Sequence, residues 1–189
     1  ILNLSETESN NYEYLLVAYD FYHKIENYEK AFPIIKKIKN LKQDNYIIWA
    51  QALYNGIQIE SYKEVVNLGE KALKIFPNKD DLRVLIAIGN FHLNEYEVVY
   101  EMLKNTGENF DEPVLKMQKN ILLAESAFKI NKINEAFSIF EMLIKEFPDN
   151  LIIKNNYSYY LALEKKDLEK AKKLSLETIK SDPKSSTFL

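Results

Sequence analysis

Two histidines are the side chains in this sequence that can change charge near neutral pH without a large pKa shift. Asp20-x-x-His23 places a carboxylate and an imidazole on one face of a predicted helix, a spacing that di-iron bundles use for metal ligands. Those bundles need two such motifs and two further glutamates, and Asp/Glu-x-x-His occurs once here. His92-x-x-Glu95 has the reverse order. We therefore expect both histidines to be solvated or packed side chains rather than metal ligands.

Other kinds of catalytic motif are missing. The sequence contains no glycine-rich phosphate loop and no nucleophile elbow. It contains no cysteine, which excludes disulfides and thiolate sites. The sequence predicts a protein that is not an enzyme and that uses no cofactor or metal.

Composition narrows the class of partner. The 189 residues carry a formal charge of −3 with acids and bases interspersed, so no basic stripe is available to hold nucleic acid. No run approaches the roughly 18 apolar residues of a membrane helix. A hydrophobic fraction of 47% with only 4 Gly and 5 Pro favours helices joined by short turns. We expect a protein or peptide partner.

A repeat of about 35 residues organises the chain. Small residues recur at intervals of 34, 34, 37 and 35, namely Ala31, Val65, Val99, Ala136 and Ala171. Three residues before each lies a large apolar side chain: Tyr28, Tyr62, Tyr96, Ile133 and Leu168. Twelve residues after each lie Gln43, Pro77, Asp111, Pro148 and Pro183. Because proline cannot continue a helix, the three prolines mark the ends of units.

Each unit reads as two amphipathic helices. Apolar residues at helical spacing predict the first helices at 11–24, 45–58, 80–93, 115–130 and 150–164. Predicted caps of the second helices are Asn27, Ser61, Asn94, Asn131 and Asp167. Ser61 and Glu64 have the spacing of a capping box.

These features predict five units near 12–45, 46–79, 80–114, 115–149 and 150–185. Residues 1–11 are interpreted as a leader or linker, and 186–189 as the start of a truncated further repeat. A longer connection is expected at 105–113, and Pro33 should bend the second helix of the first unit.

The pattern resembles the tetratricopeptide-repeat (TPR) family over about residues 12–185. The second unit carries the resemblance in Trp49, Ala52, Leu53, Gly56, Tyr62, Ala72 and Pro77. The fourth carries it in Leu123, Ala124, Ala127, Ala136, Phe140 and Pro148. Elsewhere the tryptophan position holds Leu15, Arg83, Asn120 and Lys154. The resemblance implies an all-α, right-handed superhelical solenoid of about five antiparallel helix pairs.

The resemblance also implies a partner-binding groove lined by the first helices. The inward positions are Leu16, Asp20, Ala50, Tyr54, Val84, Ile88, Ile121, Glu125, Phe128, Asn155 and Tyr159. A short turn in the third unit would shift its two entries by one residue. This lining is mainly apolar and aromatic, unlike the Lys, Asn and Arg of relatives that clamp a chaperone's C-terminal carboxylate. We expect a groove for a peptide or helix of a partner. The alternative is that several of these side chains only pack between helices.

The last unit, with Asn155-Asn156-Tyr157-Ser158-Tyr159-Tyr160, looks like bacterial TPR proteins, many of them lipoproteins. This likeness favours the cell envelope or periplasm, with the cytoplasm as the alternative. Leu174, Leu176 and Ile179 should leave an apolar strip on the 167–181 helix, through which the chain self-associates.

Two functions fit the sequence. The first is a non-catalytic adaptor that binds a partner protein. The second is the targeting or regulatory arm of a larger enzyme or of a secretion or assembly machine.

Trp49 gives a direct test of the repeat assignment. As a core residue of the second unit, Trp49→Ala should reduce the free energy of unfolding by about 3–5 kcal/mol. Denaturant unfolding followed by circular dichroism measures this loss. A melting temperature close to that of the wild type would contradict the core placement.

Overall fold

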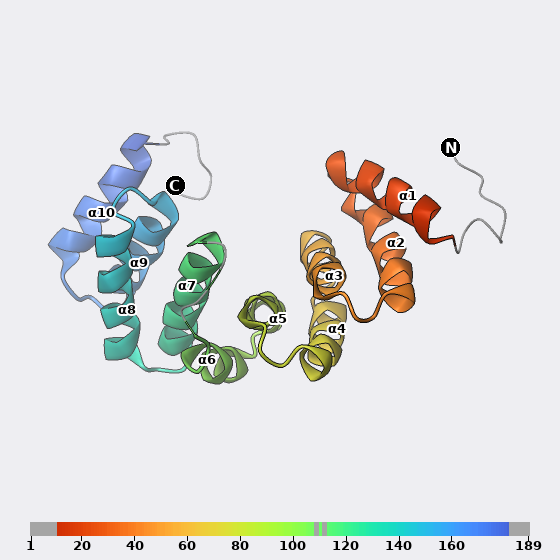
Figure 1. The fold of residues 1–189 in the computed structure, drawn as a ribbon. Helices are drawn as coiled ribbons and strands as arrows, with labels where there is room; N and C mark the ends of the chain where they lie inside the picture. Colours follow the sequence, from red (N-terminus) through yellow and green to blue (C-terminus); the bar gives the residue numbers. More distant parts are fainter. Residues whose placement is uncertain (1–10, 108–109, 111–112, 182–189) are drawn as a thin grey trace. The chain divides into compact units, whose positions relative to one another are not determined.

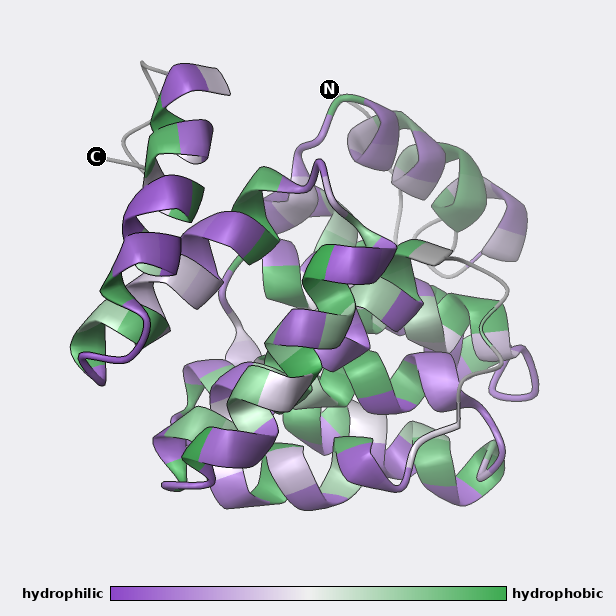
Figure 2. Cartoon of the chain, turned by 90° about the vertical axis from the view of Figure 1, so that its left-hand side faces the viewer, coloured by the Kyte–Doolittle hydropathy of each residue, from purple (hydrophilic) through white to green (hydrophobic). Residues whose placement is uncertain are grey.

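The computed structural model describes residues 11–107, 110 and 113–181, and within them the chain forms ten α-helices and no strand (Figure 1). The helices are α1 (Tyr12–Lys24), α2 (Tyr28–Leu41), α3 (Tyr46–Gln58), α4 (Tyr62–Ile75), α5 (Asp80–His92), α6 (Tyr96–Lys104), α7 (Pro113–Lys129), α8 (Ile133–Glu146), α9 (Leu151–Leu163) and α10 (Leu168–Ser181). Apolar and polar residues alternate around most of them (Figure 2). The all-α fold class predicted from the sequence is therefore confirmed.

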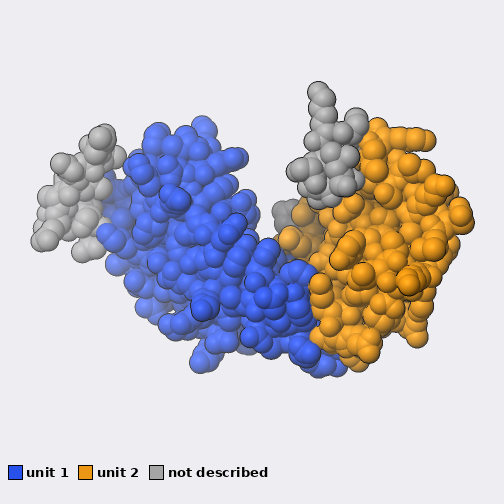
Figure 3. All heavy atoms as spheres, turned by 180° about the vertical axis from the view of Figure 1, so that it is seen from behind, with its two compact units in different colours: residues 1–111 blue, residues 112–189 orange. Residues whose placement is uncertain are grey.

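The helices form two compact units, Ile1–Asp111 and Glu112–Leu189 (Figure 3). In the first unit each helix from α1 to α6 packs on the next, and α3 also packs on α5. In the second unit α7 packs on α8, α8 on α9 and α9 on α10. Within each unit, short turns make consecutive helices antiparallel, so their apolar stripes are covered by neighbouring helices.

The repeat assignment agrees with the burial of its marker residues. Ala31, Val65, Val99 and Ala136 are fully buried, and Ala171 is 5% exposed. A side chain larger than these would have to displace packed neighbours, so the size of the residue at these five positions matters for the packing of each pair.

Trp49 and Arg83 occupy the tryptophan position of two repeats, and both donate a hydrogen bond to a backbone carbonyl six residues earlier. Trp49 is buried, as predicted, and its Nε1 donates to the carbonyl of Gln43 at 2.9 Å. Arg83, in the same position of the third unit, donates from Nη2 to the carbonyl of Pro77 at 2.5 Å. Each donor ties the start of a first helix to the turn six residues earlier, which explains how the pattern tolerates this substitution.

Asparagines begin four of the helices as caps. The Oδ1 atoms of Asn11, Asn45 and Asn150 accept from backbone N–H groups of the first helices α1, α3 and α9 at 3.0 Å. Asn27 accepts from Lys30 N at 3.2 Å and caps α2, as predicted. These bonds satisfy N–H groups that have no partner within the helix.

The predicted capping box at Ser61 is wrong. The Ser61 side chain makes no capping hydrogen bond to α4. Glu64 instead accepts from Lys36 Nζ at 2.8 Å, an ion pair between α4 and α2. The Glu64 carboxylate pairs with Lys36 of the preceding repeat instead of capping its own helix. A local sequence motif cannot reveal such a distant partner.

Asn94 and Asn131 are not caps, contrary to the prediction. They lie one residue earlier, with φ of 63° and 65°, in the left-handed region that asparagine tolerates. Glu26, Glu60 and Lys165 hold the equivalent positions at φ of 55°, 56° and 52°. Asp167 does cap α10, because its Oδ1 accepts from Lys170 N at 3.2 Å.

The same backbone bond closes every first helix. The amide after the left-handed residue donates to a carbonyl five residues back, at 2.9 Å in Asn27–Tyr22 and 2.8 Å in Ser61–Gly56. Equivalent bonds are Glu95–Asn90, Lys132–Ala127 and Lys166–Leu161. This 6→1 bond is that of a Schellman motif, and it gives the first helices of all five repeats the same C-terminal geometry.

The connection after α6 is the irregular one, as predicted. α6 has 9 residues, against 14 in α2, α4, α8 and α10. Part of 105–113, residues 1–10 of the predicted leader 1–11 and the segment 186–189 lie outside the described residues, while Asn11 is the cap of α1. α2 continues through Pro33, and the expected bend stays a prediction.

Gly69 lets α4 and α5 approach closely, and its substitution tests that contact. A Cβ at Gly69 would lie 2.2 Å from Cγ1 of Ile86, a fully buried side chain. Alanine gains up to about 1 kcal/mol over glycine in a helix, but overpacking costs about 1–3 kcal/mol. We expect Gly69→Ala to lower the free energy of unfolding, measured by denaturant titration.

The control is the same change in an Ile86→Ala background, where the obstructing atoms are gone. There Gly69→Ala should be neutral or stabilising. Stabilisation in the wild-type background would disprove the close contact.

Candidate functional site

The predicted groove residues of the first unit fall into two groups. Tyr54 is 41% exposed and Asp20 is exposed, while Leu16 and Ala50 are partly exposed. Val84 is fully buried and Ile88 is 7% exposed. The prediction that these last two residues are accessible to a partner is wrong.

The reason lies in α5, which is apolar around most of its circumference. Leu82 and the whole run 84–90 are buried, because α3, α4 and α6 all pack on this helix. A helix that is hydrophobic all round is buried. The third repeat therefore supplies core to its unit rather than an open binding surface.

Tyr54 belongs to an aromatic cluster. Its ring meets Tyr28 and His23 edge to face, with centroids 5.9 and 6.1 Å away. His23 stacks on Tyr19 at 5.2 Å, and the Tyr19 hydroxyl accepts from buried Asn55 Nδ2 at 3.1 Å. Burial, opposed in part by the Asn55 hydrogen bond, raises the pKa of Tyr19 to about 12.

Both histidines stack on tyrosine rings, and His92 is exposed to solvent. His23 lies in this cluster, and His92 stacks on Tyr62 with ring centroids 4.2 Å apart. Asp20 is exposed at the surface of α1. Among the residues that the structure describes, no three His, Asp or Glu side chains gather in a way that could hold a metal ion.

In the second unit, two of the predicted groove residues support the core. The Phe128 ring lies 4.3 Å from that of Tyr160 and 6.3 Å from that of Phe137. Ile121 also packs against the buried cluster of this unit. Phe128 and Ile121 therefore pack between helices, the alternative to groove binding that the sequence left open.

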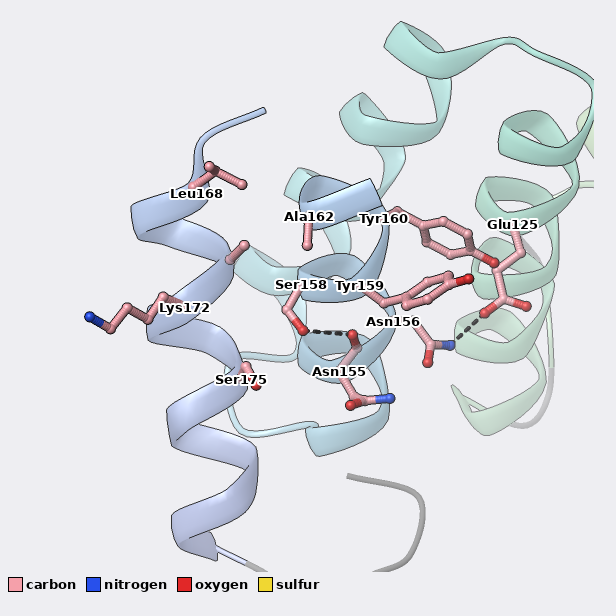
Figure 4. Close-up of a pocket in the computed structure, with 11 residues that line it drawn as sticks. Glu125, Asn155, Asn156, Ser158, Tyr159, Tyr160, Ala162, Leu168, Lys172 and Ser175 are labelled. Atoms are coloured by element: carbon pink, nitrogen blue, oxygen red, sulfur yellow. Dashed lines mark hydrogen bonds between the residues drawn. The ribbon is translucent and has the colours of Figure 1, made fainter. Parts of the chain in front are cut away.

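The other three meet at one pocket of about 640 Å³ (Figure 4). It extends across α9, from Glu125 on α7 to Leu168, Ala171, Lys172 and Ser175 on α10. α9 contributes Asn155, Asn156, Ser158, Tyr159, Tyr160 and Ala162. Tyr159 is 56% exposed, so an aromatic side chain is open to solvent beside polar groups.

Glu125 is a partly buried acid at one end of the pocket. Asn156 Nδ2 donates to its Oε1. Burial raises the pKa of this carboxyl to about 7, although Lys129 and the Asn156 hydrogen bond act in the opposite direction. Removal from water disfavours the charged form more than these two groups stabilise it.

Interactions among α8, α9 and α10 hold the walls of the pocket. Glu141 on α8 accepts hydrogen bonds from Tyr157 Oη on α9 and from Lys170 Nζ on α10. Lys154 on α9 pairs with Glu177 on α10 at 2.7 Å. The Tyr157 ring stacks on Phe140 with centroids 5.3 Å apart. The pocket is therefore built on packed helices rather than on a loop.

The α10 wall departs from the repeat pattern. Lys172 follows the small marker residue by one position, where the earlier units have Phe32, Val66, Tyr100 and Phe137. Ser175 follows it by four, where they have Ile35, Gly69, Leu103 and Phe140. This polar change was visible in the sequence and would have indicated the pocket.

The expected apolar strip on α10 is partly wrong. Leu174 is 6% exposed because it packs in the core of the second unit. Leu176 and Leu168 are 45% and 55% exposed, but Lys172 and Lys173 lie between them along the helix. Self-association through this face stays a prediction.

None of the helices within the described ranges combines the length and apolar character that a membrane crossing requires.

No family model and no curated protein matches the sequence. Solved structures do match the fold. MamA 41-end from Desulfovibrio magneticus RS-1 has a TM-score of 0.76 at 11% identity, over 93% of this chain and 97% of that one. MamA MSR-1 C2 has a TM-score of 0.72 at 13% identity, over 90% and 98% of the two chains.

YrrB, described as a TPR protein with an unusual peptide-binding site, has a TM-score of 0.69 at 17% identity, over 97% of this chain and 92% of that one. At such identities the likeness shows the fold. The chain has the TPR fold that the repeat pattern predicted.

The raised pKa of Glu125 predicts a specific pH dependence of stability. Between its ordinary value of 4.5 and about 7, the folded state holds a proton that the unfolded state has lost. Stability should therefore fall as pH rises through this window, by at most about 3 kcal/mol. Glu125→Gln should remove this decline, measured as the unfolding free energy from pH 4.5 to 8.

The control is Glu164→Gln, which removes an exposed carboxylate at the end of α9. Its pH profile should follow that of the wild type. A Glu125→Gln profile parallel to the wild type would contradict the burial of this acid.

Proposed function

We propose, from the TPR fold of this chain, that it is a non-catalytic scaffold that binds a peptide or helix of a partner protein on the faces of its first helices. The observation that carries the proposal is the pocket across α9, where Glu125, Asn155 and Tyr159 come together. All three were singled out from the sequence as inward positions.

The chemistry of the pocket suits a peptide. Asn155 and Asn156 carry side-chain amides, which can donate to and accept from a peptide backbone. Tyr159 offers a large, partly exposed ring with a polar tip, the kind of side chain that is enriched at protein interfaces. Its ring is supported by Tyr160, with centroids 5.2 Å apart, so little side-chain freedom is lost on binding.

The first unit offers a second surface of the same type. Tyr54 is exposed but supported by Tyr28 and His23. An exposed aromatic ring that its neighbours already orient is a favourable anchor for a partner. The two surfaces are proposed separately, as one contact site in each unit.

The test uses a peptide selected on the intact chain by phage display. Tyr159→Ala or Tyr54→Ala should weaken its binding at least tenfold, measured by fluorescence anisotropy. Tyr14→Ala is the matched control, because Tyr14 on α1 is 48% exposed and lies outside both surfaces. Phe128→Ala should instead reduce stability, since that ring packs on Tyr160.

Unchanged affinity in both the Tyr159→Ala and Tyr54→Ala variants, with folding intact, would refute binding on these faces.

A further inference from the structure

The pocket across α9 is polar at positions where the fourth repeat is apolar. Asn156 and Ser158 stand where the fourth repeat has Leu122 and Ala124, when the first helices are aligned by their closing backbone bond. Lys172 and Ser175 make the same change on α10. In the fourth repeat the corresponding face of α8 is covered by the aromatic rings of α9. The pocket of the fifth repeat therefore offers polar groups that suit a polar ligand.

The acidic side chain at the α7 end of the pocket is Glu125, which Lys129 of the same helix also influences. Glu125 points from α7 toward α9, beside Tyr159 and Asn156 (Figure 4). Lys172 lines the opposite end, and its side chain extends away from α9. The ionised Glu125 carboxylate would repel an anionic ligand at the α7 end, and it would attract a cationic one.

The aromatic rings at this end favour the same kind of ligand. Tyr159 and Tyr160 meet edge to face next to Glu125, and Tyr159 is open to solvent. A guanidinium can stack on an aromatic face while it donates two hydrogen bonds to a carboxylate. A carboxylate beside open tyrosine rings is thus a site for a cationic side chain, arginine in particular.

We propose that the α7 end of this pocket binds an arginine or lysine side chain of the partner segment, with Glu125 as its counter-charge and Tyr159 as its stacking surface. The inference rests on the proposed function, because it specifies which side chain the peptide presents to the pocket. It assigns Glu125 a role in specificity.

The proposal carries a pH dependence. Since burial raises the pKa of Glu125 to about 7, the carboxyl loses its proton on meeting a cation. Binding of a cationic peptide should therefore strengthen between pH 6 and 8. The other charged or titratable groups at the pocket are Lys129 on α7, Tyr159 and Tyr160 on α9, and Lys172 on α10. Comparison with Glu125→Gln separates the contribution of Glu125 from theirs.

The experiment uses three acetylated, amidated pentapeptides, Ser-Asn-X-Asn-Ser, in which X is arginine, norleucine or glutamate. Binding to the intact chain is followed by backbone amide shifts in NMR spectra. The arginine peptide should perturb the α9 amides around Asn155–Tyr160 and bind about tenfold tighter than the norleucine peptide. The glutamate peptide should bind most weakly. Glu125→Gln should abolish the preference for arginine and its pH dependence, whereas Glu164→Gln should change neither.

Equal affinity for the arginine and norleucine peptides, or shifts confined to another part of the chain, would overturn the proposal. A preference for the glutamate peptide that Lys172→Ala removes would reverse the assigned charge and overturn it as well. Failure here is distinguishable from failure of the proposed function. A phage-selected peptide that still depends on Tyr159 would leave the scaffold function standing without the cationic specificity.

Discussion

The helices of this chain can bury their apolar stripes only against one another, and small side chains at fixed positions make the contact close enough. Small or β-branched side chains are buried at the same position of every helix pair, namely Ala31, Val65, Val99, Ala136 and Ala171. Gly69 has the same function between α4 and α5, where a single Cβ would collide with Ile86. Because a packed interior cannot absorb an extra methylene without strain, these positions fix how each helix faces the next. The exposure of every groove residue follows from that arrangement.

Burial decides which inward positions are available to a partner. Val84 is buried because three helices pack on α5, whereas Tyr54 on α3 and Tyr159 on α9 are exposed to solvent. Glu125 lies between these extremes, near enough to solvent to contact a ligand and buried enough to have a raised pKa. The fold supplies the same scaffold in each repeat, and the difference between packing and binding depends on individual side chains.

The sequence predicted the fold well because the signals for it are local. Helix boundaries at Asn11, Asn45 and Asn150 are set by a side chain that caps the next turn, and hydrophobic spacing identifies the buried face. The Ser61 capping box failed for a non-local reason, since Glu64 pairs with Lys36 from the preceding repeat. The pocket was only partly foreseen. The environment of Glu125 depends on Asn156, which is 31 residues away and reaches it only through the packing of α9.

The turns within the helix pairs have a consequence of another kind. Glu, Asn and Lys all occupy the left-handed position, yet the 6→1 backbone bond forms each time. The geometry of the joint is therefore a property of the main chain, and the identity of the turn residue is nearly free to vary. Sequence drift in the turns leaves the register of the first helices intact. In each helix pair, residues on the exposed face of the first helix can therefore change without a change in the turn that joins the two helices.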